Sequence, residues 1–238
     1  MGFKKHIPNI ITCCNLLSGC VSCVMAMEGN FVLALAFIVL GAVFDFFDGM
    51  VARLLKVSSP LGVQLDSLAD DVTFGFAPSF MVFVFMQGLE FPDYLASVSG
   101  LLPFAAFFIS ALSAMRLAMF NIDKRQTTTF IGLPTPANAL FWASLVVGYG
   151  NFIYSLNYGW MLMLGLLLLS CYLLVADIPM FSLKFKYLAW RANKIRYSFL
   201  LVSAPMLLLG FGAAVPIISL YVAVSIVKSL IKKTKTAQ

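Results

Sequence analysis

Eight hydrophobic stretches follow one another along the sequence and are separated by short polar segments. They cover roughly residues 8–28, 30–54, 64–88, 94–120, 134–154, 159–176, 198–213 and 214–231. Each of the first six approaches the ~20 apolar residues that an α-helix needs to cross a bilayer. The last two are shorter and contain proline and glycine, which fits a tight hairpin or one broken helix. We therefore predict an all-α, polytopic membrane bundle of about eight transmembrane helices.

Composition supports a single integral-membrane domain. Hydrophobic residues make up 61% of the 238 residues and charged residues only 11%, which leaves no room for a separate soluble domain. We expect one catalytic domain over residues 1–238, with a core at 8–176 and a C-terminal hydrophobic hairpin at 198–231.

The basic residues predict the orientation of this bundle. If the spans alternate, all 16 Lys and Arg residues fall on one side of the membrane, and the loops of the other side hold only acidic charges. The basic residues are Lys4, Lys5, Arg53, Lys56, Arg116, Lys124, Arg125, Lys184, Lys186, Arg191, Lys194, Arg196, Lys228, Lys232, Lys233 and Lys235. The positive-inside rule then places both termini in the cytoplasm. The net charge of +6 indicates contact with anionic headgroups of membrane lipid, and not binding of nucleic acid.

Half of the acidic residues lie in one stretch, residues 45–71, where a membrane-spanning chain makes charge costly. Asp45 and Asp48 are three residues apart, and Asp66 and Asp70 are four apart, so each pair occupies one face of a helix. The intervening segment 54–63 contains Ser, Pro and Gly and is typical of a turn. Two antiparallel helices would then direct four carboxylates at one point. Because this point lies near Arg53, we expect it to face the cytoplasm.

Four clustered carboxylates repel one another and need a counter-charge. An all-oxygen set suits Mg²⁺ or Mn²⁺, and four carboxylates favour two ions, which commonly clamp a phosphate or pyrophosphate. We therefore expect Asp45, Asp48, Asp66 and Asp70 to bind metal. A buried charge network and an ion pathway are the alternatives. Asp71 points about 100° away from Asp70 on a helix, so we interpret it as a neighbour and not a ligand.

Small residues beside the aspartates would let a ligand approach the backbone. They are Gly49, Ala52 and Gly62, and close helix packing is their alternative role. Arg53 could pair with a phosphate oxygen, or it could face anionic lipid at the end of its helix.

The fixed positions of this stretch resemble a known signature. They read Asp45-x-x-Asp48-Gly49-x-x-Ala52-Arg53, then eight residues, then Gly62-x-x-x-Asp66-x-x-x-Asp70. This pattern resembles the CDP-alcohol phosphatidyltransferase family at every fixed position. The resemblance implies a homodimeric, metal-dependent membrane enzyme that displaces CMP from a CDP-linked alcohol. It also implies that Asp45, Gly49, Ala52, Arg53, Gly62 and Asp66 border the CDP-lipid, and that Asp70 is the general base. In this family the first helix borders the nucleotide, so Asn15 is a further candidate, with an interhelical hydrogen bond as its alternative.

Four further segments resemble the phosphatidylserine synthase branch of this family, which occurs in bacteria and archaea. They are Asp66–Asp70, Val72–Pro78, Arg116–Asn121 and Phe130–Ala137. The branch transfers a phosphatidyl-type group from CDP-diacylglycerol, or from archaeal CDP-archaeol, to the hydroxyl of L-serine. Arg116, Lys124 and Arg125 are candidates for binding the acceptor, although a basic cytoplasmic loop also explains the last two.

Two rival functions remain open at this point. A sister enzyme of the family would use glycerol phosphate or an inositol compound as the acceptor. A membrane cation transporter would line its path with the aspartates, although transporter sites usually lie near the bilayer midplane at the interface of a repeat. The sequence shows no duplicated motif.

Overall fold

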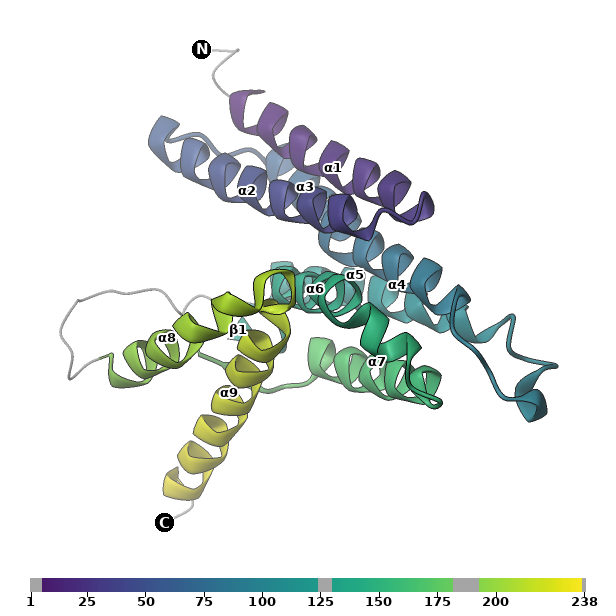
Figure 1. The fold of residues 1–238 in the computed structure, drawn as a ribbon. Coiled ribbons are helices and arrows are strands. Elements are labelled where there is room, and N and C mark those ends of the chain that lie inside the picture. Colours follow the sequence, from purple (N-terminus) through teal and green to yellow (C-terminus); the bar gives the residue numbers. More distant parts are fainter. Residues whose placement is uncertain (1–5, 124–129, 182–192, 237–238) are drawn as a thin grey trace.

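The computed structural model describes residues 6–123, 130–181 and 193–236, and these residues are helical almost throughout. The helices and short turns are α1 (His6–Met27), α2 (Phe31–Leu55), α3 (Pro60–Asp70), a π-helical turn (Asp71–Phe76), α4 (Ala77–Gln87), 3-10 turns at Asp93–Leu95 and Leu102–Ala106, α5 (Phe107–Ile122), α6 (Thr135–Tyr154), α7 (Gly159–Val175), α8 (Lys194–Met206), a 3-10 turn (Leu207–Gly212) and α9 (Ala214–Thr236). Two-residue strands β1 (Phe130–Ile131) and β2 (Pro179–Met180) pair antiparallel. Figure 1 shows their arrangement.

The helices confirm the predicted all-α membrane bundle. Six helical segments of the described chain are long and apolar enough to cross a bilayer, and α7 is a shorter apolar helix. Together with α6, they account for all eight predicted hydrophobic stretches. The protein is therefore an integral, multi-pass membrane protein. The last two stretches form two separate helices, α8 and α9, which meet at a turn where Gly210 has φ +58°.

One predicted stretch begins later than expected. Hydrophobic residues start at about 94, but the continuous helical segment that ends in α5 begins at Leu102. Pro103 lies in its first turn, where the missing N–H of proline costs no hydrogen bond. The residues before it form short turns instead, so the helix is shorter than the apolar run that predicted it.

The turns that flank α2 set the geometry of the first three helices. Asn30 caps the start of α2 by accepting a hydrogen bond from the Leu33 N–H at 3.1 Å. Lys56 ends the helix in the left-handed conformation, with φ 51°. Ser59 then caps α3 by accepting from the Gly62 N–H at 3.0 Å, and Pro60 follows it in the first turn. The predicted turn is thus confirmed, but it is shorter than the predicted segment 54–63, because α2 ends at Leu55 and α3 begins at Pro60.

Two glycines, one on α1 and one on α2, let these helices pack closely against the π-helical turn. A Cβ atom on Gly19 would lie 2.6 Å from Thr73 Oγ1, and one on Gly41 would meet the methyl group of the same threonine. The Thr73 hydroxyl donates a hydrogen bond to the Asn15 carbonyl oxygen at 2.9 Å. Only glycine leaves room for these approaches, so the three segments are held together one turn beyond Asp70.

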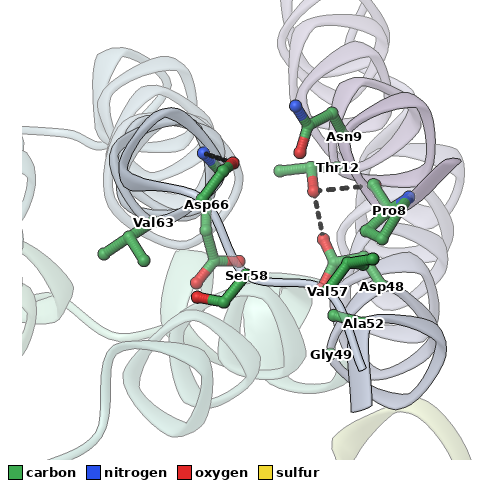
Figure 2. Close-up of a pocket in the computed structure, with 12 residues that line it drawn as sticks. Pro8, Asn9, Thr12, Asp48, Gly49, Ala52, Val57, Ser58, Val63 and Asp66 are labelled. Atoms are coloured by element: carbon green, nitrogen blue, oxygen red, sulfur yellow. Dashed lines mark hydrogen bonds between the residues drawn. The ribbon is translucent and has the colours of Figure 1, made fainter. Parts of the chain in front are cut away.

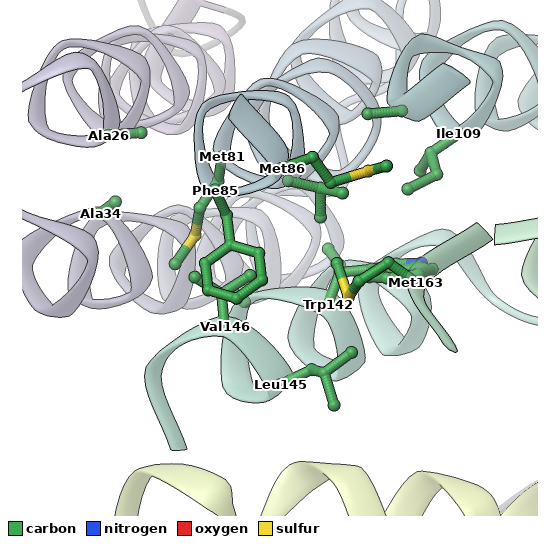
Figure 3. Packing of buried hydrophobic residues seen from close by; sticks show 14 of the residues in the cluster. Ala26, Ala34, Met81, Phe85, Met86, Ile109, Trp142, Leu145, Val146 and Met163 are labelled. Atoms are coloured by element: carbon green, nitrogen blue, oxygen red, sulfur yellow. The ribbon is translucent and has the colours of Figure 1, made fainter. Parts of the chain in front are cut away.

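The hydrophobic core lies mainly between α4 and α6. Met81, Phe85 and Trp142 are almost completely buried there, and Met163 of α7 packs beside them (Figure 3). Gly148 on α6 lies against the backbone of Gly212, so the turn between α8 and α9 packs directly on α6. A smaller cluster that includes Phe181, Phe199 and Tyr221 packs α8 and α9 against β2.

Candidate active site

Four of the five aspartates of the 45–71 stretch converge, as their spacing predicts. Carboxylate oxygens of Asp45 and Asp48 on α2 and of Asp66 on α3 all lie within 4.8 Å of one another. The carboxyl group of Asp70, one turn further along α3, interacts directly with that of Asp45. Asp48 is the most buried of the four, with only 5% of its surface exposed. Negative charge is thus concentrated at one point between two membrane-spanning helices.

The donor set fits a hard divalent cation. All the converging ligand atoms are carboxylate oxygens, which suit Mg²⁺ or Mn²⁺ and are a poor match for soft metals. A bound cation would remove the repulsion between carboxylates that otherwise share one small space. Asp45, Asp48 and Asp66 can therefore hold a metal ion, and Asp70 lies beside them.

Helix α1 supplies the hydrogen bonds that orient two of these carboxylates. The Thr12 hydroxyl donates to Asp48 Oδ2 at 2.6 Å, and the Asn15 amide donates to Asp70 Oδ1 at 3.1 Å. Both α1 residues are buried, and Asn15 is 0% exposed. The structure thus places Asn15 in an interhelical hydrogen bond, which is the alternative to nucleotide contact that its sequence position left open. Sequence reasoning did not single out Thr12.

A cavity of about 160 Å³ opens beside Asp48 and Asp66. Its wall contains the small residues of the signature, Gly49, Ala52 and Gly62. The other lining residues are Pro8, Asn9, Thr12, Val57, Ser58, Ser59 and Val63. Figure 2 shows that the α1 residues and Asp66 approach this space from opposite sides. Asp48 and Asp66 therefore border a space that a polar ligand can enter, whereas Asp45 and Asp70 do not line it.

The N-terminal part of α1 is the portion of this site that sequence reasoning missed. Pro8, Asn9 and Thr12 line the cavity, and Asn9 Oδ1 lies 3.1 Å from the position of a Cβ atom on Gly62. A signal was available, because Asn9, Thr12 and Asn15 recur every three residues in an otherwise apolar helix. Such a spacing places polar groups along one helix face.

Arg53 lies at the rim of the cavity. A Cβ atom on Gly49 would be 3.6 Å from Arg53 Nη1, so the guanidinium group lies over that glycine. The Arg53 side chain is exposed, which leaves its donors available to an incoming phosphate.

Of the three acceptor candidates, the structure describes only Arg116. Lys124 and Arg125 lie outside the described residues. Arg116 on α5 is 6% exposed, its guanidinium lies 5.6 Å from the ring centroid of Phe120, and it interacts electrostatically with Asp70 and Tyr221. Its Nε and Nη2 atoms have no hydrogen-bond partner among the described residues. A buried cation with unused donors thus lies within electrostatic range of the last aspartate of the signature.

Asp71 points away from this group. One of its oxygens lies 2.7 Å from the position of a Cβ atom on Gly75, beside Ser113 of α5. The expectation that Asp71 is a neighbour of the cluster and not part of it agrees with this placement.

Comparison with known proteins identifies the family of this chain. The model of the CDP-alcohol phosphatidyltransferase family matches residues 5–172, which include α1 to α6 and most of α7. A protein of Bacillus subtilis named CDP-diacylglycerol–serine O-phosphatidyltransferase is 38% identical over 133 residues, which are 56% of this chain and 70% of the relative. Relatives with the same name in Helicobacter pylori and Methanocaldococcus jannaschii are 34% identical over 171 residues and 32% identical over 166 residues. These alignments cover 68% and 69% of this chain, and 69% and 71% of the respective relatives. The chain therefore belongs to the CDP-alcohol phosphatidyltransferase family.

Proposed function

We propose that this protein transfers a phosphatidyl group from a CDP-linked diradyl lipid to the hydroxyl group of L-serine and releases CMP, a step of phospholipid biosynthesis. The observation that carries the proposal is the convergence of the signature aspartates beside a cavity lined by the signature's small residues. The relatives named CDP-diacylglycerol–serine O-phosphatidyltransferase support the choice of serine.

Asp45, Asp48, Asp66 and Asp70 would hold the metal, as two ions of Mg²⁺ or Mn²⁺. Bound cations of this kind neutralise charge on a pyrophosphate and on the leaving CMP. The chain's own contribution is to keep the ligands in place, because Thr12 and Asn15 orient Asp48 and Asp70 before any substrate arrives.

The CDP end of the lipid would occupy the 160 Å³ cavity. Gly49, Ala52 and Gly62 leave the space for it, Asp66 lines the same cavity, and the Asp45 carboxylate lies within 4.8 Å of that of Asp66. Arg53 would bind a phosphate oxygen from the rim. Asn15 would not contact the nucleotide itself. It would position Asp70, because its amide already donates a hydrogen bond to that carboxylate.

Asp70 is the best-placed general base. Its Oδ1 atom accepts the hydrogen bond from Asn15, which fixes the direction of the carboxylate. Serine oxygen would attack the lipid-side phosphorus in line, Asp70 would take the hydroxyl proton, and the phosphorus–oxygen bond to CMP would break.

Arg116 would bind the carboxylate of serine. It lies within electrostatic range of Asp70 and has unused donors, so a serine held by its carboxylate would have its hydroxyl group on the side of the base. Lys124 and Arg125 remain acceptor candidates from the sequence alone.

The site would face the cytoplasm of a bacterial or archaeal cell, with both termini on that side, because of the one-sided distribution of basic residues. The lipid substrate would enter from the membrane and serine from the cytosol. A homodimer, which the family resemblance implies, belongs to the same proposal.

An acceptor panel tests this function. Purified protein is mixed with CDP-diacylglycerol, Mg²⁺ or Mn²⁺, and serine, glycerol phosphate or inositol in turn, and CMP release is measured. We expect release with serine and little with the other two. Release that requires glycerol phosphate or inositol would reassign the acceptor within the family. A parallel reaction with CDP-archaeol distinguishes an ether lipid from an ester lipid. No CMP release with any acceptor, together with metal uptake into sealed vesicles, would favour the cation transporter.

A further inference from the structure

A second cavity lies between α6, α7 and α9. Its volume is about 280 Å³, close to the lower end of the range for small-molecule sites. It shares no residue and no helix with the aspartate cavity, which α1, α2, α3 and their connecting turn enclose. Its α9 wall extends from Ile218 to Ile226, which lie eight positions apart, or about 12 Å along the helix. The cavity is thus a groove with room for a segment of a hydrocarbon chain.

A directional chain of hydrogen bonds ends at the wall of this groove. Trp142 Nε1 donates to Ser170 Oγ at 2.9 Å, and Ser170 Oγ donates to Asn138 Oδ1 at 2.6 Å. An indole N–H can only donate, so the serine hydroxyl accepts from it and passes its own proton on to the asparagine. This order fixes the amide of Asn138, with the oxygen toward Ser170 and the nitrogen elsewhere.

The amide nitrogen of Asn138 is left as an unpaired donor. Asn138 is 0% exposed, and its Nδ2 atom has no hydrogen-bond partner among the described residues. Exchanging the amide oxygen and nitrogen of Asn138 would not remove the unpaired donor, because the nitrogen would then face the hydroxyl proton of Ser170. A buried donor without a partner is costly, so the site favours a ligand that brings an acceptor oxygen.

Water is a poor occupant of this groove. A buried water needs roughly two to four polar partners, and most of the wall is apolar. Ser219 also lines the groove, but its hydroxyl donates to the Val215 carbonyl oxygen at 2.8 Å within α9. The groove therefore suits an apolar chain that carries a single acceptor.

The position of Asn138 matches the ester region of a lipid. It lies in the first turn of α6, and Leu173 on the same wall lies in the last turn of α7. In the topology that the sequence predicts, both ends lie near the cytoplasmic membrane surface, where the ester carbonyl groups of phospholipids join the hydrocarbon to the headgroups.

We propose that the α6–α7–α9 groove is a second lipid site, which holds one acyl chain of a resident membrane phospholipid. An ester carbonyl oxygen of this lipid accepts a hydrogen bond from Asn138 Nδ2. The groove offers nothing that recognises a nucleotide and shares no residue with the aspartate cavity, so it does not prefer the CDP-lipid to bulk phospholipid. Bulk lipid surrounds these helices, so mass action favours it.

An ester and ether pair of lipids tests the hydrogen bond. Purified, delipidated protein is titrated with diacyl phosphatidylglycerol or with its dialkyl ether analogue, and binding is followed by native mass spectrometry. We expect the diacyl lipid to bind about 2- to 10-fold more tightly, the worth of one hydrogen bond. Asn138→Leu removes this difference. Equal binding of the two lipids to the parent protein would overturn the role of Asn138.

Two valine variants on α9 test the groove itself and do not disturb Asn138. Val222 lines the middle of the groove, whereas Val227 is 55% exposed and does not line it. Val222→Phe should abolish the bound lipid and its increase in the thermal unfolding midpoint, and Val227→Phe should retain both. Lipid binding that survives Val222→Phe contradicts the proposal.

Discussion

Two of the four converging carboxylates are held by side chains of a different helix. Thr12 and Asn15 of α1 donate to Asp48 and Asp70, so the charge cluster is assembled from three helices although all its acidic residues come from two. Hydrogen bonds of this kind fix the direction of each oxygen, and a metal site depends on that direction.

Removing the Thr12 hydroxyl should therefore weaken the metal site. Thr12→Val keeps the shape of the side chain but leaves Asp48 without its 2.6 Å donor. We expect the metal concentration for half-maximal transfer to rise about 10- to 100-fold. Thr12→Ser retains the donor and should restore most of the activity. An unchanged metal requirement in Thr12→Val would mean that Asp48 is positioned without α1.

Metal removal should stop transfer altogether. The carboxylates of Asp45, Asp48 and Asp66 lie within 4.8 Å of one another and need a cation between them. Excess chelator should abolish CMP release, and added Mg²⁺ or Mn²⁺ should restore it. Asp45→Asn and Asp66→Asn should be inactive in any metal while the protein still inserts into the membrane. Full activity in chelator would contradict the metal site.

Asp70 should be needed for the chemical step more than for binding. Asp70→Asn should still bind the CDP-lipid with metal, but transfer should fall about 10²- to 10⁴-fold, as expected when a general base is lost. Single-turnover CMP release and a separate lipid-binding measurement distinguish the two effects. Asp71→Asn is the matched control, because its side chain faces Gly75 and Ser113, and it should stay within a few-fold of the parent. An Asp70→Asn protein that is equally active would place the base elsewhere.

At the scale of helices, the connection from α3 to α4 positions the last aspartate. The π-helical turn Asp71–Phe76 follows directly after Asp70, and Thr73 within it contacts both Gly19 and Gly41. Such turns often occur at functional sites because they redirect side chains without breaking the helix. The contacts of Thr73 thus fix where α3 delivers Asp70 relative to α1 and α2.

A methyl group on Gly19 should disturb this arrangement. In Gly19→Ala the new Cβ atom would lie 2.9 Å from Thr73 Cα, which is backbone and cannot rotate away. We expect a loss of about 1–3 kcal/mol in stability, typical of an overpacked core, together with reduced transfer. Thermal unfolding and CMP release measure the two effects.

Gly165 on α7 provides the control for this substitution. A Cβ atom there would meet no heavy atom within 4 Å, so Gly165→Ala should be neutral or stabilising. If both alanine variants behave alike, contact with Thr73 does not hold α1 in place.

The sequence predicted the helices and the convergence of the aspartates, but not the contacts from α1 and the π-helical turn that hold the aspartates in place. Charge spacing at Asp45, Asp48, Asp66 and Asp70 and the turn signal around Pro60 were enough to expect convergence, because both depend on local geometry. The contribution of α1 depends on packing between helices that are far apart in sequence, so neither the Thr12 hydrogen bond nor the π-helical turn could be derived from local patterns. The late start of the segment before α5 shows the same limit, since an apolar run extends beyond the helix that it contains.

At the scale of the whole molecule, the aspartate site lies between α2 and α3, beside α1 and toward the end of α2. The site lies about 12 Å along the helix from Arg53, because Asp45 precedes that residue by eight positions. A site at this depth is reached from the side of the membrane on which Arg53 lies. The orientation of the bundle therefore decides whether serine comes from the cytosol.

Cysteine labelling in intact cells should place both termini and the loop 177–197 in the cytoplasm. The 16 Lys and Arg residues gather on one side of the predicted topology, while Glu28, Glu90 and Asp93 lie on the other. In a variant without the five native cysteines, Lys235→Cys should resist a membrane-impermeant thiol reagent until the cells are opened. Asp93→Cys, at an exposed position of the opposite loop, should react at once and serves as the control. Labelling of Lys235→Cys in sealed cells would invert the topology, and the aspartates would then open to the outside, where neither cytosolic serine nor newly made CDP-lipid could reach them.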